Sequence, residues 1–209
     1  SASSTPDDLP LVRPLKDEEF RPWMPQSHKS SWRPRWNGEE RVPDTLAEAI
    51  RAFVYACAIR KLRGQGTQHS SMLIHVTRYT AVQGAVDSQV AAYVQDLKGR
   101  YTRSIDLAQV EEMMRREYEG HFMPGMRTIR NALVEGETLG DFSWQEVRTI
   151  LPDVLSDIRV REINGTAKDA LDYADNEATG LKVIAIGGDK LARGLTLEGL
   201  CTSYFLRTS

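Results

Sequence analysis

The sequence predicts an α/β fold in which a mostly parallel sheet is flanked by helices. Two observations lead to this prediction. Short apolar runs bounded by turn residues, which are typical of buried parallel strands, occur at residues 72–76 and 183–186. Helical patterns alternate with strand patterns along the chain, as expected where each strand returns through a crossover helix. The expected order is helix, strand, helix, helical insertion, strand, short helix, strand, loop and strand.

The first expected element is a helix over residues 45–62. Apolar residues recur there at helical spacing, and Gly64 ends the pattern. Thr45 followed three residues later by Glu48 predicts a capping box at the start of this helix. A second helix is expected at residues 82–97, after the first strand.

The chain from about residue 105 to 155 is helical in pattern but is interrupted by prolines and glycines. We interpret it as a helical insertion between two strands of the sheet. Ser143 followed by Glu146 predicts a second capping box within it. The remaining expected elements are strands at residues 158–163, 183–186 and 201–206 and a short helix at residues 167–174.

A chain of 209 residues with 41 % hydrophobic content fits one domain of ordinary size. Residues 1–43 hold most of the prolines and have no periodic pattern, so we expect an irregular arm followed by the α/β domain at residues 44–209. Residues 29–36 (KSSWRPRW) interleave basic and aromatic side chains. Such a segment either anchors the arm by its tryptophans, which is the favoured interpretation, or contacts nucleic acid.

The net charge of the chain is -2, so any contact with nucleic acid must come from a local patch of cations. No apolar run reaches membrane-spanning length, and the start of the chain has no signal-peptide core. These features predict a cytoplasmic protein with no membrane partner. Cys57 and Cys201 lie in apolar surroundings, and we expect both to be buried free thiols in a reducing compartment.

The loop after the strand at residues 183–186 carries most of the candidate chemistry. Residues 187–199 (GGDKLARGLTLEG) begin with two glycines, which allow the backbone to approach a ligand closely. Lys190 and Arg193 add cations, and Thr196 adds a hydroxyl. Because ligands bind at the carboxyl ends of strands in open α/β sheets, we expect this loop to lie at the ligand edge. The alternative is a strand-to-helix turn with solvated charges.

Several catalytic arrangements are missing from the sequence. The loop is not a Walker A motif, since Leu195 rather than a lysine follows Gly194, and no other segment matches GxxxxGK[ST]. The four histidines are scattered without metal-ligand spacing. No arrangement of carboxylates and lysine typical of a metal-dependent nuclease stands out. We therefore assign no catalytic residue and no metal ligand.

Two segments of the chain resemble a known family. IHVTRY at residues 74–79 and IGGDKLARGLTLEGLCTSYFLR at residues 186–207 resemble the carboxyl-terminal RecA-like lobe of superfamily 2 helicases. More narrowly, residues 40–209 resemble the Z1 domain family of candidate endonucleases, which occurs in large bacterial helicase-like proteins. The resemblance implies a RecA-like sheet with helices on its faces.

The resemblance also implies roles for individual residues. In the helicase pattern, hydroxyl and basic residues after the first of these strands contact the nucleic-acid backbone, a role that falls on Thr77 and Arg78. Thr196 stands where many members carry an acidic residue that meets the ribose. The residues of the glycine-bounded loop that the pattern implies are Gly188, Lys190 and Arg193 for nucleic acid and Gly194 and Thr196 for nucleotide.

As a function, the resemblance implies a fragment of an ATP-dependent DNA helicase or translocase with a role in restriction-like defence. ATP and Mg²⁺ would serve the full-length parent, and we do not expect them to bind tightly here, because the Walker motifs are absent and the arginine-finger motif would lie beyond Ser209. The implied partners are DNA, held weakly through its backbone, and the amino-terminal ATPase lobe of the same protein.

Two other functions remain open at this point. The chain could be a metal-dependent endonuclease domain in its own right. It could also be a non-catalytic module that binds a partner protein through residues 105–155.

Overall fold

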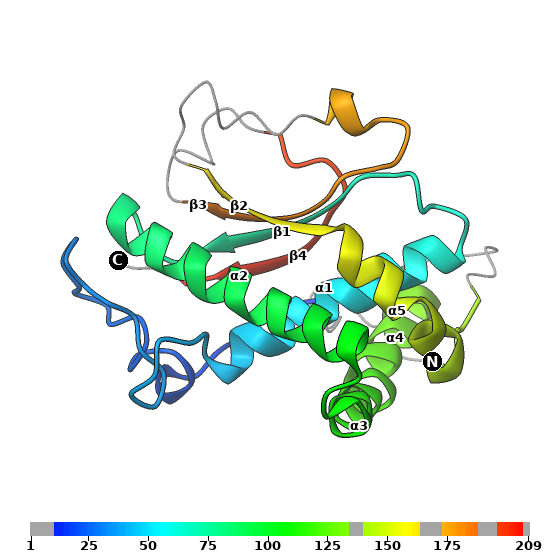
Figure 1. Ribbon diagram of the computed structural model, residues 1–209, viewed down its shortest axis with the longest axis horizontal. Helices are drawn as coiled ribbons and strands as arrows, with labels where there is room; N and C mark the ends of the chain where they lie inside the picture. The colour runs from blue at the N-terminus through cyan, green and yellow to red at the C-terminus, as the bar shows by residue number, and fades with distance from the viewer. Residues whose placement is uncertain (1–10, 134–139, 164–172, 188–195, 207–209) are drawn as a thin grey trace.

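The computed structural model describes residues 11–133, 140–163, 173–187 and 196–206. At its centre, the described strands form one four-stranded sheet with the order β2-β3-β1-β4, in which all pairs are parallel (Figure 1). The expected parallel sheet is therefore confirmed. Its strands are β1 (Ser70–His75), β2 (Ile158–Ile163), β3 (Lys182–Gly187) and β4 (Leu200–Phe205).

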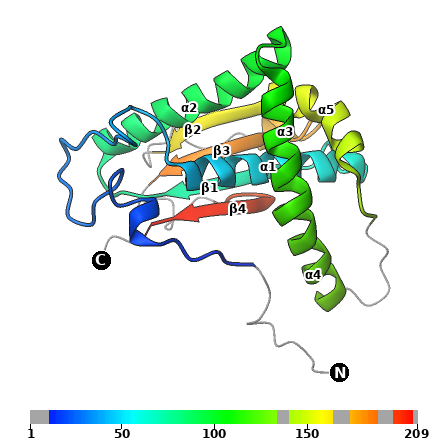
Figure 2. The same cartoon turned by 90° about the horizontal axis from the view of Figure 1, so that it is seen from below.

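The longer helices gather on one face of the sheet, as Figure 2 shows from below. Apolar side chains of α1, α2 and α5 pack there against alternate residues of the strands and form the main core. No described helix is both long and apolar enough to cross a membrane. The helices are α1 (Asp44–Leu62), α2 (Thr80–Arg103), α3 (Leu107–Glu117), α4 (Met123–Leu133) and α5 (Trp144–Asp157), with the short helices η2 (Asp17–Glu19), η3 (Tyr118–Phe122) and η5 (Ala174–Asn176).

The opposite face of the sheet is covered differently, and we call it the loop face. Within the described ranges, residues 173–181 and 196–199 lie on this face, where Leu197 packs against a small cluster around Ala185. Because side chains alternate between the faces of a strand, the register assigns each residue to one face. The loop face carries Arg159, Arg161 and Ile163 of β2, Val183, Ala185 and Gly187 of β3, Ser71, Leu73 and His75 of β1, and Ser203 and Phe205 of β4.

The described residues between α2 and β2 are mostly helical, as expected. α3, the π-helix η3 and α4 follow one another and cross the middle of α1 (Figure 2). α5 instead joins the core between α1 and α2, and its last residue directly precedes β2. The capping box at the start of α5 is confirmed, because the N–H of Glu146 donates to the Ser143 hydroxyl and the Glu146 carboxylate accepts from the N–H of Ser143.

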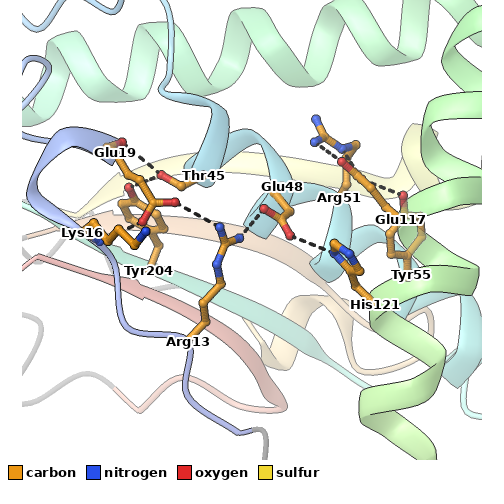
Figure 3. Close-up of polar contacts among 10 residues, drawn as sticks. All are labelled: Arg13, Lys16, Glu19, Thr45, Glu48, Arg51, Tyr55, Glu117, His121 and Tyr204. Atoms are coloured by element: carbon orange, nitrogen blue, oxygen red, sulfur yellow. Dashed lines mark hydrogen bonds and ion pairs between the residues drawn. The ribbon is translucent and has the colours of Figure 1, made fainter.

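The capping box expected at the first helix is wrong. α1 begins at Asp44 with Pro43 as its N-cap, so Thr45 already lies inside the first turn. Its buried hydroxyl is 2.9 Å from the hydroxyl of Tyr204 on β4, and the Glu48 carboxylate binds Arg13 of the arm (Figure 3). Both side chains are therefore used in tertiary contacts, which local sequence spacing does not reveal.

The prediction that both cysteines are buried is confirmed for Cys57 and wrong for Cys201. Cys57 is buried in α1, and burial raises the pKa of its thiol to about 12. Cys201 is exposed. It lies on β4, an edge strand of the sheet that the structure describes, next to the point where the register between β1 and β4 shifts.

The tryptophans of residues 29–36 anchor the arm on the body, as the favoured interpretation predicts, because Trp36 is buried in the main core and Trp32 packs against it. The buried Trp23 donates its indole N–H to the side chain of Gln89 on α2 over 2.8 Å. Gln89 in turn donates to the carbonyl of Pro34 over 2.7 Å, and Trp32 donates to the carbonyl of Trp23 over 2.9 Å. The arm is thus tied to the first half of α2.

A buried ion pair connects α1 with the helical insertion (Figure 3). Arg51 donates to both carboxylate oxygens of Glu117 over 2.6 and 2.5 Å, and it also donates to the hydroxyl of Tyr93. Burial disfavours the charged guanidinium, but the hydrogen bonds to Glu117 and the contact with Tyr93 outweigh it and raise the pKa of Arg51. The hydroxyl of Tyr55 also donates to Glu117, over 3.3 Å.

Arg51→Met is expected to destabilise the domain, because Glu117 would lose its cation while remaining largely buried. Breaking a buried pair from one side costs several kcal/mol, so we expect a loss of about 3 kcal/mol in the free energy of unfolding in urea. Arg115→Met is the matched control, since its 2.9 Å ion pair with Glu112 lies at the surface of the same insertion. If both variants lost the same free energy of unfolding, the ion pair of Arg51 with Glu117 would not be what holds the insertion on α1.

Candidate nucleic-acid interface

The carboxyl edge of the sheet brings the ends of β1 and β3 together. The two strands are parallel neighbours, with Ile74 opposite Ile186. Thr77 and Arg78 follow β1, and the glycine-rich loop leaves β3 at Gly187, so both segments begin at the same edge. Four of the candidate residues, namely Gly188, Lys190, Arg193 and Gly194, lie outside the described residues.

Thr77 is buried beneath the arm, with 1 % of its surface exposed. Its hydroxyl is 2.7 Å from Nε2 of His28, whose Nδ1 is 2.7 Å from the carbonyl oxygen of Pro25. Because a carbonyl only accepts, Nδ1 carries the proton, and in the neutral ring Nε2 accepts from the Thr77 hydroxyl. The N–H of Tyr79 donates to the same hydroxyl oxygen over 3.2 Å. In this conformation the arm, rather than an external ligand, contacts Thr77.

Arg78 is exposed at this edge. Its guanidinium lies over the ring of Tyr79, 5.1 Å from the centroid, and donates to the Tyr79 hydroxyl over 3.0 Å. Tyr79 is the N-cap of α2 and receives the ring of His28 edge-on at 5.5 Å. The tyrosine therefore orients the guanidinium at the edge, where a cation of this geometry can bind a phosphate.

The described end of this loop, residues 196–199, lies on the loop face and reaches the amino edge of the sheet. Thr196 is exposed, and Leu197 after it packs near Ala185. The carbonyl of Glu198 accepts from the Ser71 hydroxyl over 2.7 Å, at the amino end of β1. The expectation that the whole loop lies at the ligand edge is therefore wrong for its last residues, because a parallel β4 must begin at the amino edge.

Gly199 permits the close approach of this segment to the start of β1. Its φ is +62°, and a Cβ at this position would lie 2.0 Å from the carbonyl oxygen of His69. The backbone at the start of β4 thus passes against the residue that precedes β1. A side chain larger than hydrogen would displace one of the two segments.

Two carboxylates that the sequence analysis did not identify lie near the carboxyl end of β2. Asp87 of α2 is half-buried, and burial, together with the charge of Glu162, raises the pKa of its carboxyl against the opposing effect of Arg161. Oδ1 of Asp87 has no hydrogen-bond partner in the described part of the chain. Asp87 and Glu162 are 75 positions apart, and neither belongs to a recognisable motif.

In the ranges that the structure describes, no group of three or more His, Cys, Asp or Glu side chains is arranged to hold a metal ion. Asp87 and Glu162 would need a further ligand to form such a site. The carboxyl edge therefore presents both signs of charge, with the cation of Arg78 at β1 and these carboxylates toward β2.

A groove of about 870 Å³ runs along β4, the outer strand of the described sheet, between this strand, α1 and residues 11–15 of the arm. Its lining is mostly apolar. Arg13 crosses it to bind the carboxylates of Glu19 and Glu48, and the Glu48 carboxylate also lies 3.8 Å from Nδ1 of His121 (Figure 3). These contacts tie the arm to α1 and the insertion.

The profile of one protein family, the Z1 domain, matches residues 45–209 of this fold. The chain belongs to the Z1 domain family. The narrower of the two resemblances is thereby confirmed. Comparisons with curated proteins and with solved structures gave no match. The matched region contains the whole described sheet and the described helices α1 to α5, except for the first residue of α1. The arm with His28 precedes the matched region.

His28→Ala and Thr77→Val are expected to show coupled effects on stability, because each removes one side of the same partly buried hydrogen bond. We expect a coupling free energy of about 1 kcal/mol in a double-mutant cycle measured by urea unfolding. The control cycle pairs His28→Ala with Thr102→Val, whose hydroxyl donates to a carbonyl within α2 and does not contact the arm. A coupling no larger than that of the control would contradict the contact.

Proposed function

We propose that this Z1 domain is the DNA-contacting part of a cytoplasmic, ATP-dependent helicase- or translocase-like protein, and that its sheet corresponds to a RecA-like lobe. The observation that supports this most directly is the parallel pairing of β1 with β3. It gives Arg78 and the segment after Gly187 a common edge, which is the ligand edge of open α/β sheets. For the parent protein we propose a role in restriction-like defence.

The contact that we propose is electrostatic. Arg78 is exposed and held by Tyr79 beside the amino-terminal end of α2, where the helix dipole adds positive potential. Lys190 and Arg193 belong to the loop that begins at this edge. Cations placed in this way neutralise phosphates without reading the bases, so binding should tolerate any sequence. Thr77 contributes by holding the arm and the backbone before Arg78.

ATP and Mg²⁺ do not fit the residues of this chain by themselves. Phosphoryl transfer needs a phosphate cradle, a carboxylate that holds Mg²⁺ and an arginine that stabilises the transferred charge. The glycine-rich loop has no lysine directly after Gly194, and no GxxxxGK[ST] segment occurs elsewhere in the sequence. In our proposal the other lobe of the parent supplies these groups, and this domain supplies DNA contacts.

Arg78→Ala should weaken DNA binding and lower the slope of log K against log salt by about one, because one phosphate contact is lost. Arg193→Ala should do the same if its loop contacts DNA. Titration with a labelled oligonucleotide at several salt concentrations measures both effects. Arg116→Ala is the control, since this exposed arginine pairs with Glu112 on the insertion.

A melting curve beside each titration separates binding from folding. If Arg193→Ala lowered the melting temperature and left DNA affinity unchanged, Arg193 would be a structural residue. The same result for Arg78 would remove the main support for a DNA interface at this edge.

The isolated chain is expected to show no ATP hydrolysis above a buffer blank and no tight ATP binding, because its sequence contains no GxxxxGK[ST] phosphate cradle. Release of inorganic phosphate and displacement of a fluorescent nucleotide test these two points. Turnover that a substitution within this chain abolishes would refute the assignment of ATP chemistry to another lobe.

A further inference from the structure

Two aromatic rings stack at the carboxyl end of the loop face. His75 is the last residue of β1, Phe205 is the last residue of β4, and the two are directly paired in the sheet. Their ring centroids are 4.7 Å apart and their planes differ by 15°. Phe205 nevertheless has 54 % of its surface exposed. The pair is therefore a flat aromatic surface that is open to solvent on the side of Phe205.

The sheet register is the reason for this exposure. Tyr204 and Leu206 point to the helix-covered face and are buried in the main core. Phe205 lies between them and must point to the opposite face. β4 is an edge strand in the described sheet, so no further strand covers the ring from the outer side. On the inner side, Gly187 of β3 follows the Ile74–Ile186 pair and brings no side chain beside His75.

The surroundings of the pair suit a nucleic-acid strand. Arg78 follows His75 by three residues and is exposed at the same edge, where it can meet a phosphate. Aromatic side chains on a sheet surface stack unpaired bases, and every base offers a ring face for this contact. A base inside a duplex is already stacked and paired, so an exposed ring selects for single strands.

We propose that the His75–Phe205 pair is a stacking platform for an unpaired base of single-stranded DNA, with Arg78 binding a neighbouring phosphate. This inference rests on the proposed DNA-binding function and specifies its substrate as a single strand. It adds a contact that is insensitive to base identity and does not change the number of ion pairs with DNA.

Phe205 also borders the groove along β4, whose walls include Leu11 and Val12. A protein strand paired with this edge is therefore the competing occupant. The stacking of Phe205 on His75 and the nearby cation of Arg78 favour a nucleic acid as the occupant. A groove that binds apolar side chains of a protein strand needs neither a stacked aromatic pair nor a cation.

The test uses the complete 209-residue chain and two labelled 20-mers. One is oligothymidylate, and the other has abasic sugars at every position, so both carry the same phosphates. Phe205→Ala should weaken binding of oligothymidylate about tenfold and leave binding of the abasic strand and the salt slope unchanged. Phe205→Trp should retain the wild-type affinity. Leu200→Ala is the matched control, because Leu200 is 49 % exposed on the same strand but at its amino end.

The outcomes separate the platform from the wider function. If the wild-type chain binds DNA with a steep salt dependence and Phe205→Ala binds oligothymidylate equally well, the platform is wrong and the proposed function stands. Equal losses of affinity for oligothymidylate and for the abasic strand would also overturn the platform. A change in oligomeric state caused by Phe205→Ala would overturn it too, because the ring would then belong to a protein contact. If neither strand binds to the wild-type chain, both proposals fail.

Discussion

The parallel hydrogen bonding of β1 with β3 on one side and β4 on the other determines where the remaining parts of this Z1 domain lie. A parallel strand requires the chain to return to the amino edge before the next strand begins. Every described strand therefore ends at one edge, and the last residues of β1, β3 and β4 lie side by side there although they are distant in sequence. Arg78, Gly187 and Phe205 are brought together by this constraint alone.

The two faces of the sheet contribute differently. The helix-covered face holds the main core, and the buried pair of Arg51 with Glu117 fixes the insertion to it. A charged pair of this kind tolerates little displacement, because either partner left alone inside the protein is costly. The loop face leaves side chains such as Phe205 exposed. Stability and surface chemistry are thus concentrated on opposite sides of one sheet.

The arm shapes the candidate interface although it precedes the matched region. Trp23 ties it to α2, and His28 binds the hydroxyl of Thr77 at the end of β1. Of the two residues after β1 that are expected to contact DNA, the arm thereby buries Thr77 and leaves Arg78 exposed beside it. A nucleic-acid strand at this edge would meet a surface built from both segments.

The sequence by itself determined the local elements. Apolar runs such as residues 183–186 must be buried, and hydroxyl and carboxylate side chains at the spacing of Ser143 and Glu146 satisfy the first N–H groups of a helix, so both features were predictable. The same spacing predicted a capping box at Thr45 that does not form. The Thr45 hydroxyl instead bonds to Tyr204, and this contact depends on which strand lies against α1.

The tertiary structure alone decided that Cys201 and Phe205 are exposed, that His28 binds Thr77, and that residues 196–199 lie at the amino edge of the sheet. The physical reason is that these properties depend on strand order and on contacts between distant segments. Local periodicity indicates only whether a side chain faces a core. It does not indicate which distant residues that side chain contacts.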